Sequence, residues 1–90
     1  MRNPARIDTR AIKMEAARQL MADRWPEYEW HVERDAVLCA AGSVSHPLRE
    51  GEPWLAGFIG ADGHTSSGIG PGPRVAFSRA RVRAGLWAGL

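Results

Sequence analysis

Cysteine is almost absent from this chain: the single Cys39 among 90 residues cannot form an internal disulfide. Long apolar runs are absent as well, because the longest, Ala36 to Ala41, is far short of the roughly 20 residues that cross a bilayer. The first thirteen residues contain no apolar stretch typical of a signal peptide. These absences predict an intracellular, cytoplasmic protein without a transmembrane segment.

Acidic residues are missing from the C-terminal end. Lysine is nearly missing from the whole chain, because Lys13 is the only lysine among twelve basic side chains and the others are arginine. The first 24 residues carry six basic and three acidic side chains. Residues 25–73 carry two basic and seven acidic side chains, and residues 74–90 carry four basic side chains and no acidic one. Basic ends of this kind can meet a polyanion. They can equally pair with the acidic middle of the same molecule. The sequence leaves both interpretations open.

The length of the chain limits its organisation to one hydrophobic core, because a domain of this size already buries only about 60–65% of its unfolded surface. The hydrophobic share of 44% and the charged share of 24% are ordinary for a folded domain, which excludes wholesale disorder. We therefore expect residues 1–90 to form a single compact domain, with residues 1–7 as a flexible N-terminal arm.

Two segments are predicted to be helical. Residues 8–24 are rich in helix-forming side chains, and Pro26 ends this helix because the residue before a proline disfavours helical geometry. Apolar residues that recur on one face of this helix are Ile7, Met14, Ala17 and Met21. Residues 74–87 form the second helix, and Pro73 suits its first position.

Strands are predicted between the helices. Residues 28–33 alternate apolar with charged side chains, which is the period of a strand with one buried face. Residues 36–41 are short and apolar, and suit a second strand. The pair Asp62-Gly63 predicts a hairpin between residues 54–59 and 64–69.

The fold class expected from this order is α+β, with a helix, a three-stranded antiparallel sheet and a helix (αβββα), and with both helices on one face of the sheet. A sheet of four strands is the alternative if Val37 to Ala41 and Trp54 to Ile59 are separate strands. Residues 42–53 contain two glycines and two prolines and are predicted to be a loop.

The second helix carries two apolar stripes, whereas a helix that lies on one sheet needs only one. The first stripe consists of Ala76, Phe77, Ala80, Ala84 and Trp87. The second stripe consists of Val75, Val82 and Leu86, and Arg79 and Arg83 lie between the two stripes. An exposed apolar stripe edged by arginine predicts a partner interface, although the N-terminal arm is an alternative cover. The residues assigned to partner binding are Arg74, Arg79, Arg81, Arg83, Val75, Val82, Leu86 and Trp87.

Groups that carry chemistry do not converge in the sequence. No two residues among Cys39 and the three histidines stand two to five positions apart, as paired zinc ligands do. Cys39 lies in an apolar run, which favours a small buried side chain over a nucleophile. The glycine- and proline-rich residues 68–73 lack the lysine and hydroxyl residue of a phosphate-binding P-loop. We therefore expect no catalytic residue, metal or cofactor.

The hairpin and the last helix resemble the double-stranded RNA-binding domain. In that family a Gly-x-Gly turn leads into a helix that opens with Lys-Lys-x-Ala-Lys and continues with regularly spaced small residues. Gly68 and Gly70 match the turn, and Arg74 matches the second lysine. The small residues are matched by Ala76, Ala80 and Ala84. Pro73 and Phe77 stand where the other two lysines would be. The resemblance implies a related α+β architecture and, with it, binding of nucleic acid.

Two functions are predicted from these features. The first is a non-enzymatic binding protein that docks on a protein or ribonucleoprotein partner, as small inhibitors from phages and mobile elements do, anti-CRISPR proteins among them. The second is a module that binds the backbone of double-stranded RNA or DNA through Arg10, Lys13, Arg18, Arg74 and Arg81. A homodimer through the second helix is a further option that the sequence leaves open.

Overall fold

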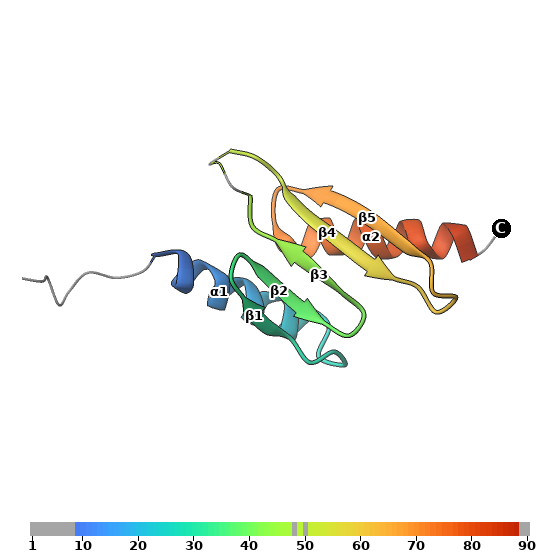
Figure 1. Ribbon diagram of the computed structural model, residues 1–90, viewed down its shortest axis with the longest axis horizontal. Helices are drawn as coiled ribbons and strands as arrows, with labels where there is room; N and C mark the ends of the chain where they lie inside the picture. The colour runs from blue at the N-terminus through green and yellow to red at the C-terminus, as the bar shows by residue number, and fades with distance from the viewer. Residues whose placement is uncertain (1–8, 48, 50, 89–90) are drawn as a thin grey trace, which may run out of the picture.

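The computed structural model describes residues 9–47, 49 and 51–88, with side chains described up to Gly85. The N-terminal arm expected over residues 1–7 lies outside this part of the chain. The elements follow in the order α1 (Thr9–Arg24), β1 (His31–Glu33), β2 (Ala36–Cys39), β3 (Gly42–Ser45), β4 (Trp54–Ile59), β5 (Thr65–Gly70) and α2 (Pro73–Ala88). The strands form one antiparallel sheet in the order β1-β2-β3-β4-β5, and both helices lie behind the same face of it (Figure 1).

The α+β class and both predicted helices are confirmed, but the prediction of three strands is wrong because the sheet has five. The segment Gly42–Ser45, predicted to be part of a loop, forms β3 and joins β2 to β4. This strand is hard to recognise because Val44 is its one large apolar residue. Gly42 is required there, since a Cβ at this position would lie 2.1 Å from the Gly57 carbonyl oxygen.

The strand predicted over residues 28–33 is shorter than expected and begins at His31. Trp30 is nevertheless buried and Tyr28 packs against the core, so both aromatic rings keep the role that the alternation predicts. The hairpin at Asp62-Gly63 is confirmed, although its loop is longer than a two-residue turn: Gly60 donates to the His64 carbonyl oxygen at 2.8 Å, and only Gly63 of the pair has a positive φ, of 86°. The backbone N–H of His64 donates to Asp62 Oδ1 at 3.1 Å and, together with the His64 ring, lowers the pKa of Asp62.

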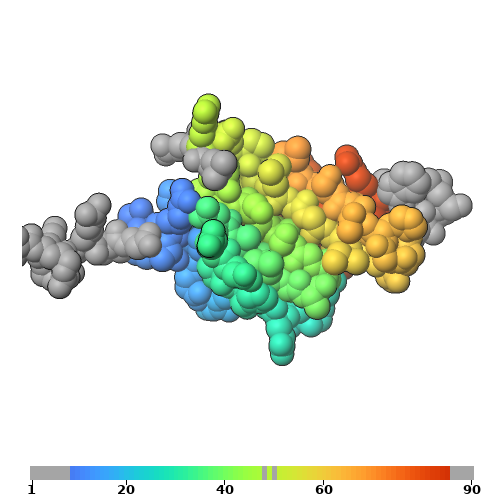
Figure 2. Space-filling model, in the orientation of Figure 1, coloured from blue at the N-terminus to red at the C-terminus, as the bar shows by residue number. Residues whose placement is uncertain are grey.

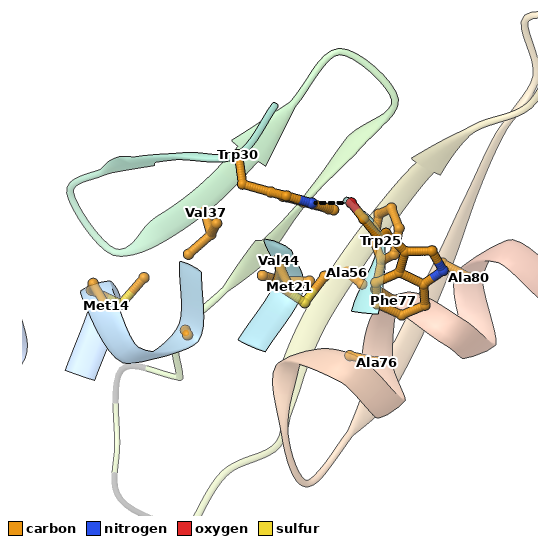
Figure 3. Packing of buried hydrophobic residues seen from close by; sticks show 11 residues of the cluster. Met14, Met21, Trp25, Trp30, Val37, Val44, Ala56, Ala76, Phe77 and Ala80 are labelled. Atoms are coloured by element: carbon orange, nitrogen blue, oxygen red, sulfur yellow. Dashed lines mark hydrogen bonds between the residues drawn. The ribbon is translucent and has the colours of Figure 1, made fainter. Parts of the chain in front are cut away.

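The core lies between the two helices and the inner face of the sheet. Helix α1 contributes Met14, Ala17 and Met21, which are all buried as their spacing predicts. Phe77 of α2 is at the centre, where it makes edge-to-face ring contacts with the aromatic residues Trp25, Tyr28, Trp30 and Phe58. Figure 3 shows Trp30 reaching across this cluster, where its Nε1 donates to the Trp25 carbonyl oxygen at 3.1 Å.

The outer face of the sheet is left without a helix (Figure 2). Its large apolar residues on β4 and β5 are Leu55, Ile59 and Ile69, of which Leu55 and Ile69 pair directly across the two strands. Each of these three side chains is about half exposed, at 53%, 47% and 53%. An antiparallel sheet commonly leaves one face solvated, so this arrangement needs no missing layer.

Candidate partner-binding site

Helix α2 rests directly on the backbone of β5. A Cβ at Gly68 would lie 2.2 Å from the Ala76 carbonyl oxygen and 2.6 Å from the Ala80 amide nitrogen. A Cβ at Gly70 would lie 2.8 Å from the Ala76 amide nitrogen. Ser66 fixes the other end of the contact, because its hydroxyl donates to the Ala80 carbonyl oxygen. The alternation of small residues on β5 therefore brings the flank of α2 to the edge of the sheet.

Arg79 and Arg83 lie on that flank. They are four residues apart on the helix and both are exposed. The Nη1 of Arg79 donates to the Ile69 carbonyl oxygen of β5 at 2.7 Å. The two arginines predicted to separate the apolar stripes thus sit beside the last strand.

Arg74 and Arg81 point to the other flank of α2, where they join the two helices. Arg74 Nε donates to the Leu20 carbonyl oxygen of α1 at 3.0 Å. The Arg81 guanidinium lies over the rings of Trp25 and Phe58, with its Cζ 5.4 and 5.8 Å from the ring centroids. These arginines therefore contact their own chain.

The second apolar stripe of α2 is only partly turned away from the sheet. Val82 is 59% exposed, whereas Val75 is 37% exposed and its side chain lies against Gly70 at the end of β5. On α1, Leu20 and Ile12 are 41% and 55% exposed. Leu86 belongs to the same stripe and Trp87 to the other, but both side chains lie outside the described ones. We call the side of α1 and α2 that points away from the sheet the helical layer.

The cations assigned to nucleic-acid binding on α1 are not gathered on one surface. Arg10 forms an ion pair with Asp35 in the β1–β2 turn, at 2.7 Å. Arg18 bonds to Glu15, which lowers the pKa of Glu15 and raises that of Arg18. Lys13 is five residues before Arg18, so the two side chains point about 140° apart around the helix. Lys13 instead lines a shallow hollow with Arg79 at the end of β5.

Metal-ligating side chains do not come together in the described part of the chain. No three side chains among its histidine, cysteine, aspartate and glutamate residues lie close enough to hold a metal ion. Burial raises the pKa of the Cys39 thiol, which disfavours the nucleophilic thiolate. Neither described helix has the length and apolar character that a membrane span requires.

Charge is divided between the helices and the rest of the molecule. The two helices carry eight basic and two acidic side chains, and α2 alone carries four arginines and no acid. Residues 25–72 carry two basic and seven acidic side chains. Among the described residues, no ion pair reaches an arginine of α2. Within the part of the chain that the structure describes, the charge of this helix is therefore not offset by an ion pair.

The chain matches no protein-family model, no curated protein and no solved structure. The resemblance to the double-stranded RNA-binding domain thus stays a prediction. Sequence reasoning also missed one feature of the site, the contact between α2 and the open edge of β5. The signal for it was Gly68 and Gly70 at alternate positions of a strand, because glycine there permits close approach of another backbone.

Proposed function

We propose that this protein is a non-enzymatic binding module that docks on a protein or ribonucleoprotein partner through the helical layer. The observation that carries the proposal is that α2 presents its arginines without an acidic partner in the described chain. Arg83, next to the exposed Val82, combines a charge with an apolar contact, a pairing typical of protein interfaces. Unpaired cations also steer an acidic surface toward the helix.

A module of this kind acts by covering a surface of its partner. Such a mode of action needs neither a pocket nor a catalytic group, because the contact surface alone blocks the partner. It is also how a small inhibitor of the anti-CRISPR kind would work, by occupying a surface that the partner uses for another molecule. The proposal for this chain is therefore inhibition by docking, with the cytoplasm as the proposed location.

Direct binding of a nucleic-acid backbone is the second candidate, and the net positive charge of the helices favours it. The geometry supports it less well. Four of its five assigned cations already contact their own chain, as Arg10 does with Asp35 and Arg74 with Leu20. Phosphates would have to compete with these contacts.

The test is capture of partners from nuclease-treated lysate of the native host by the full chain and two variants. We expect Val82→Glu combined with Arg83→Glu to reduce recovery of a stoichiometric partner protein at least about tenfold, because it removes an apolar contact and reverses a charge at a candidate interface. The matched control is Val32→Glu with Arg34→Glu, which makes the same changes at β1, away from α2. It should bind as the wild type does.

Equal recovery by both variants would contradict docking through the helical layer. In a parallel capture without nuclease, partners that disappear on nuclease treatment would indicate either a ribonucleoprotein or direct binding of nucleic acid, and a gel shift with double-stranded RNA and duplex DNA separates the two. That alternative predicts a shift at about 50 mM salt that weakens steeply as salt rises, since released counterions drive such binding.

A further inference from the structure

We propose that the open edge of β5 receives an extended, acidic segment of the partner protein as a sixth strand. This inference rests on the proposed function and names the part of the partner that is bound. The carboxylates of the segment would face Arg79 and Arg83 on one side of the sheet, and its alternate apolar residues would lie beside Ile69 on the other, extending the apolar surface that Ile69 forms with Leu55.

The hydrogen-bond pattern of the sheet shows which groups of β5 face outward. Ile59 donates its N–H to Ala41 beyond the end of β3, and Gly60 donates to His64 across the hairpin. In an antiparallel ladder these directions alternate, so the paired groups between β4 and β5 belong to the partners Phe58–Ser66, Ala56–Gly68 and Trp54–Gly70.

The backbone groups of the remaining residues of β5, which are Thr65, Ser67 and Ile69, therefore point away from β4. The sheet order places no strand on that side. The bond from Arg79 to the Ile69 carbonyl oxygen shows that this edge accepts a hydrogen-bond donor from outside the sheet. An added strand would supply both donors and acceptors along this edge.

The two edge strands of the sheet, β1 and β5, differ in the features that prevent another strand from pairing with them. Strand β1 has only three residues and carries His31 and Glu33, with Arg34 directly after it. Short edges with charged side chains are a common protection against strand addition. Strand β5 has six residues, Thr65–Gly70, without a charged side chain or a proline. Strand addition is therefore expected at β5 and not at β1.

The spacing of the arginines matches the repeat of a strand. Four residues of helix rise about 6 Å, and two residues of strand rise about 6.7 Å. Arg79 and Arg83 can therefore meet side chains two positions apart on an added strand, which lie on the same face of it. Gly68 permits close approach of α2 to the backbone of β5. The helix that carries both guanidinium groups therefore lies next to the edge of β5. Arg79 would then exchange the Ile69 carbonyl oxygen for a carboxylate.

A second copy of this chain does not fit the same edge. Two β5 strands related by a two-fold axis would bring Arg79 and Arg83 of one copy toward the same residues of the other. Like charges at that contact would oppose association, because α2 carries no acid to offset them. Complementary charge instead selects an acidic segment of a different protein.

The probe is an eight-residue peptide of alternating glutamate and valine, acetylated and amidated, titrated into the full chain at physiological salt. We expect saturable binding that slows amide exchange of Ser67 and Ile69 at least tenfold. A peptide with lysine in place of glutamate should bind at least tenfold more weakly. A peptide that is N-methylated at alternate amides keeps its charge but cannot pair, and should give no protection. Equal binding of all three peptides would overturn the proposal.

Variants of the protein test the same contact from the other side. Arg79→Gln with Arg83→Gln should weaken peptide binding at least tenfold, whereas Arg18→Gln with Arg34→Gln removes two charges elsewhere and should not. Ser67→Pro deletes an N–H that faces outward, so it should abolish binding with β4–β5 pairing retained, because proline is tolerated at such edge positions. Ser67→Ala should bind normally. If Ser67→Pro does not fold, the N-methylated peptide decides.

The outcomes separate this inference from the proposed function. Failure of the peptide together with loss of the partner in the Val82→Glu and Arg83→Glu variant would refute strand addition and leave docking through the helical layer in place. If the peptide binds and both capture variants still recover the partner protein, the edge site is established and docking through Val82 is refuted.

Discussion

Replacing Phe77 with alanine is expected to lower the free energy of unfolding by about 4 kcal/mol, because large-to-small changes at buried aromatic residues typically cost 3–5 kcal/mol. Phe77 is fully buried, and its ring contacts four other aromatic rings, the closest being that of Trp25 with centroids 5.0 Å apart. The collapse of the neighbouring rings into the cavity would be limited, since three of them are held in the short connection between α1 and β1 and the fourth in strand β4.

Chemical denaturation of Phe77→Ala and wild type measures this loss, and the melting temperature should fall by roughly 20 °C. Val82→Ala is the control in the same helix. Its side chain is 59% exposed, so the change in unfolding free energy should stay within about 0.5 kcal/mol. A loss below about 1 kcal/mol for Phe77→Ala would place this ring outside the core.

Gly68→Ala is the second change with a large expected effect, a destabilisation of about 3 kcal/mol, the upper end of what overpacking usually costs. The added methyl group would lie 2.2 Å from the Ala76 carbonyl oxygen. The oxygen is a backbone atom and the methyl carbon is bonded directly to the backbone. Relief therefore requires α2 to move away from β5, which also shifts Arg79 from the strand edge.

The control for Gly68→Ala is Gly57→Ala in the neighbouring strand, where a Cβ meets no atom within 4 Å. Thermal melting of both variants tests the difference. Gly57→Ala should melt close to the wild type, and Gly68→Ala should melt at least about 10 °C lower. Equal melting temperatures would contradict the direct contact between α2 and the β5 backbone.

The parts of the fold that the sequence predicts are those that carry a strong periodic signal. Met14, Ala17 and Met21 mark the buried face of α1, and Asp62-Gly63 marks the hairpin. β3 carries no such signal, since its serines face the open side and Gly42 serves a backbone contact with Gly57. The sheet has five strands rather than three because the four predicted segments form separate strands and β3, made of small residues, adds a fifth.

The candidate site likewise has parts that the sequence predicts and parts that it does not. The apolar stripe that includes Val75 and Val82 is visible on a helical wheel, and the structure leaves Val82 exposed on the outer side of α2 but packs Val75 against Gly70 of β5. The different surroundings of Arg74 and Arg79 are not visible there, because the Leu20 and Ile69 carbonyl oxygens that they contact are 54 and 10 residues away. Such contacts depend on how α1 and β5 pack, which a single sequence does not reveal.

Helix α2 covers the backbone of β5 and leaves the outer edge of this strand open. Amide hydrogen exchange of the free protein, resolved by residue, measures this arrangement. We expect alternation along β5: slow exchange at Ser66 and Gly68, which pair with β4, and fast exchange at Ser67 and Ile69, which face the edge. Uniform protection of all four amides would contradict this arrangement, because it would mean that the edge is already paired.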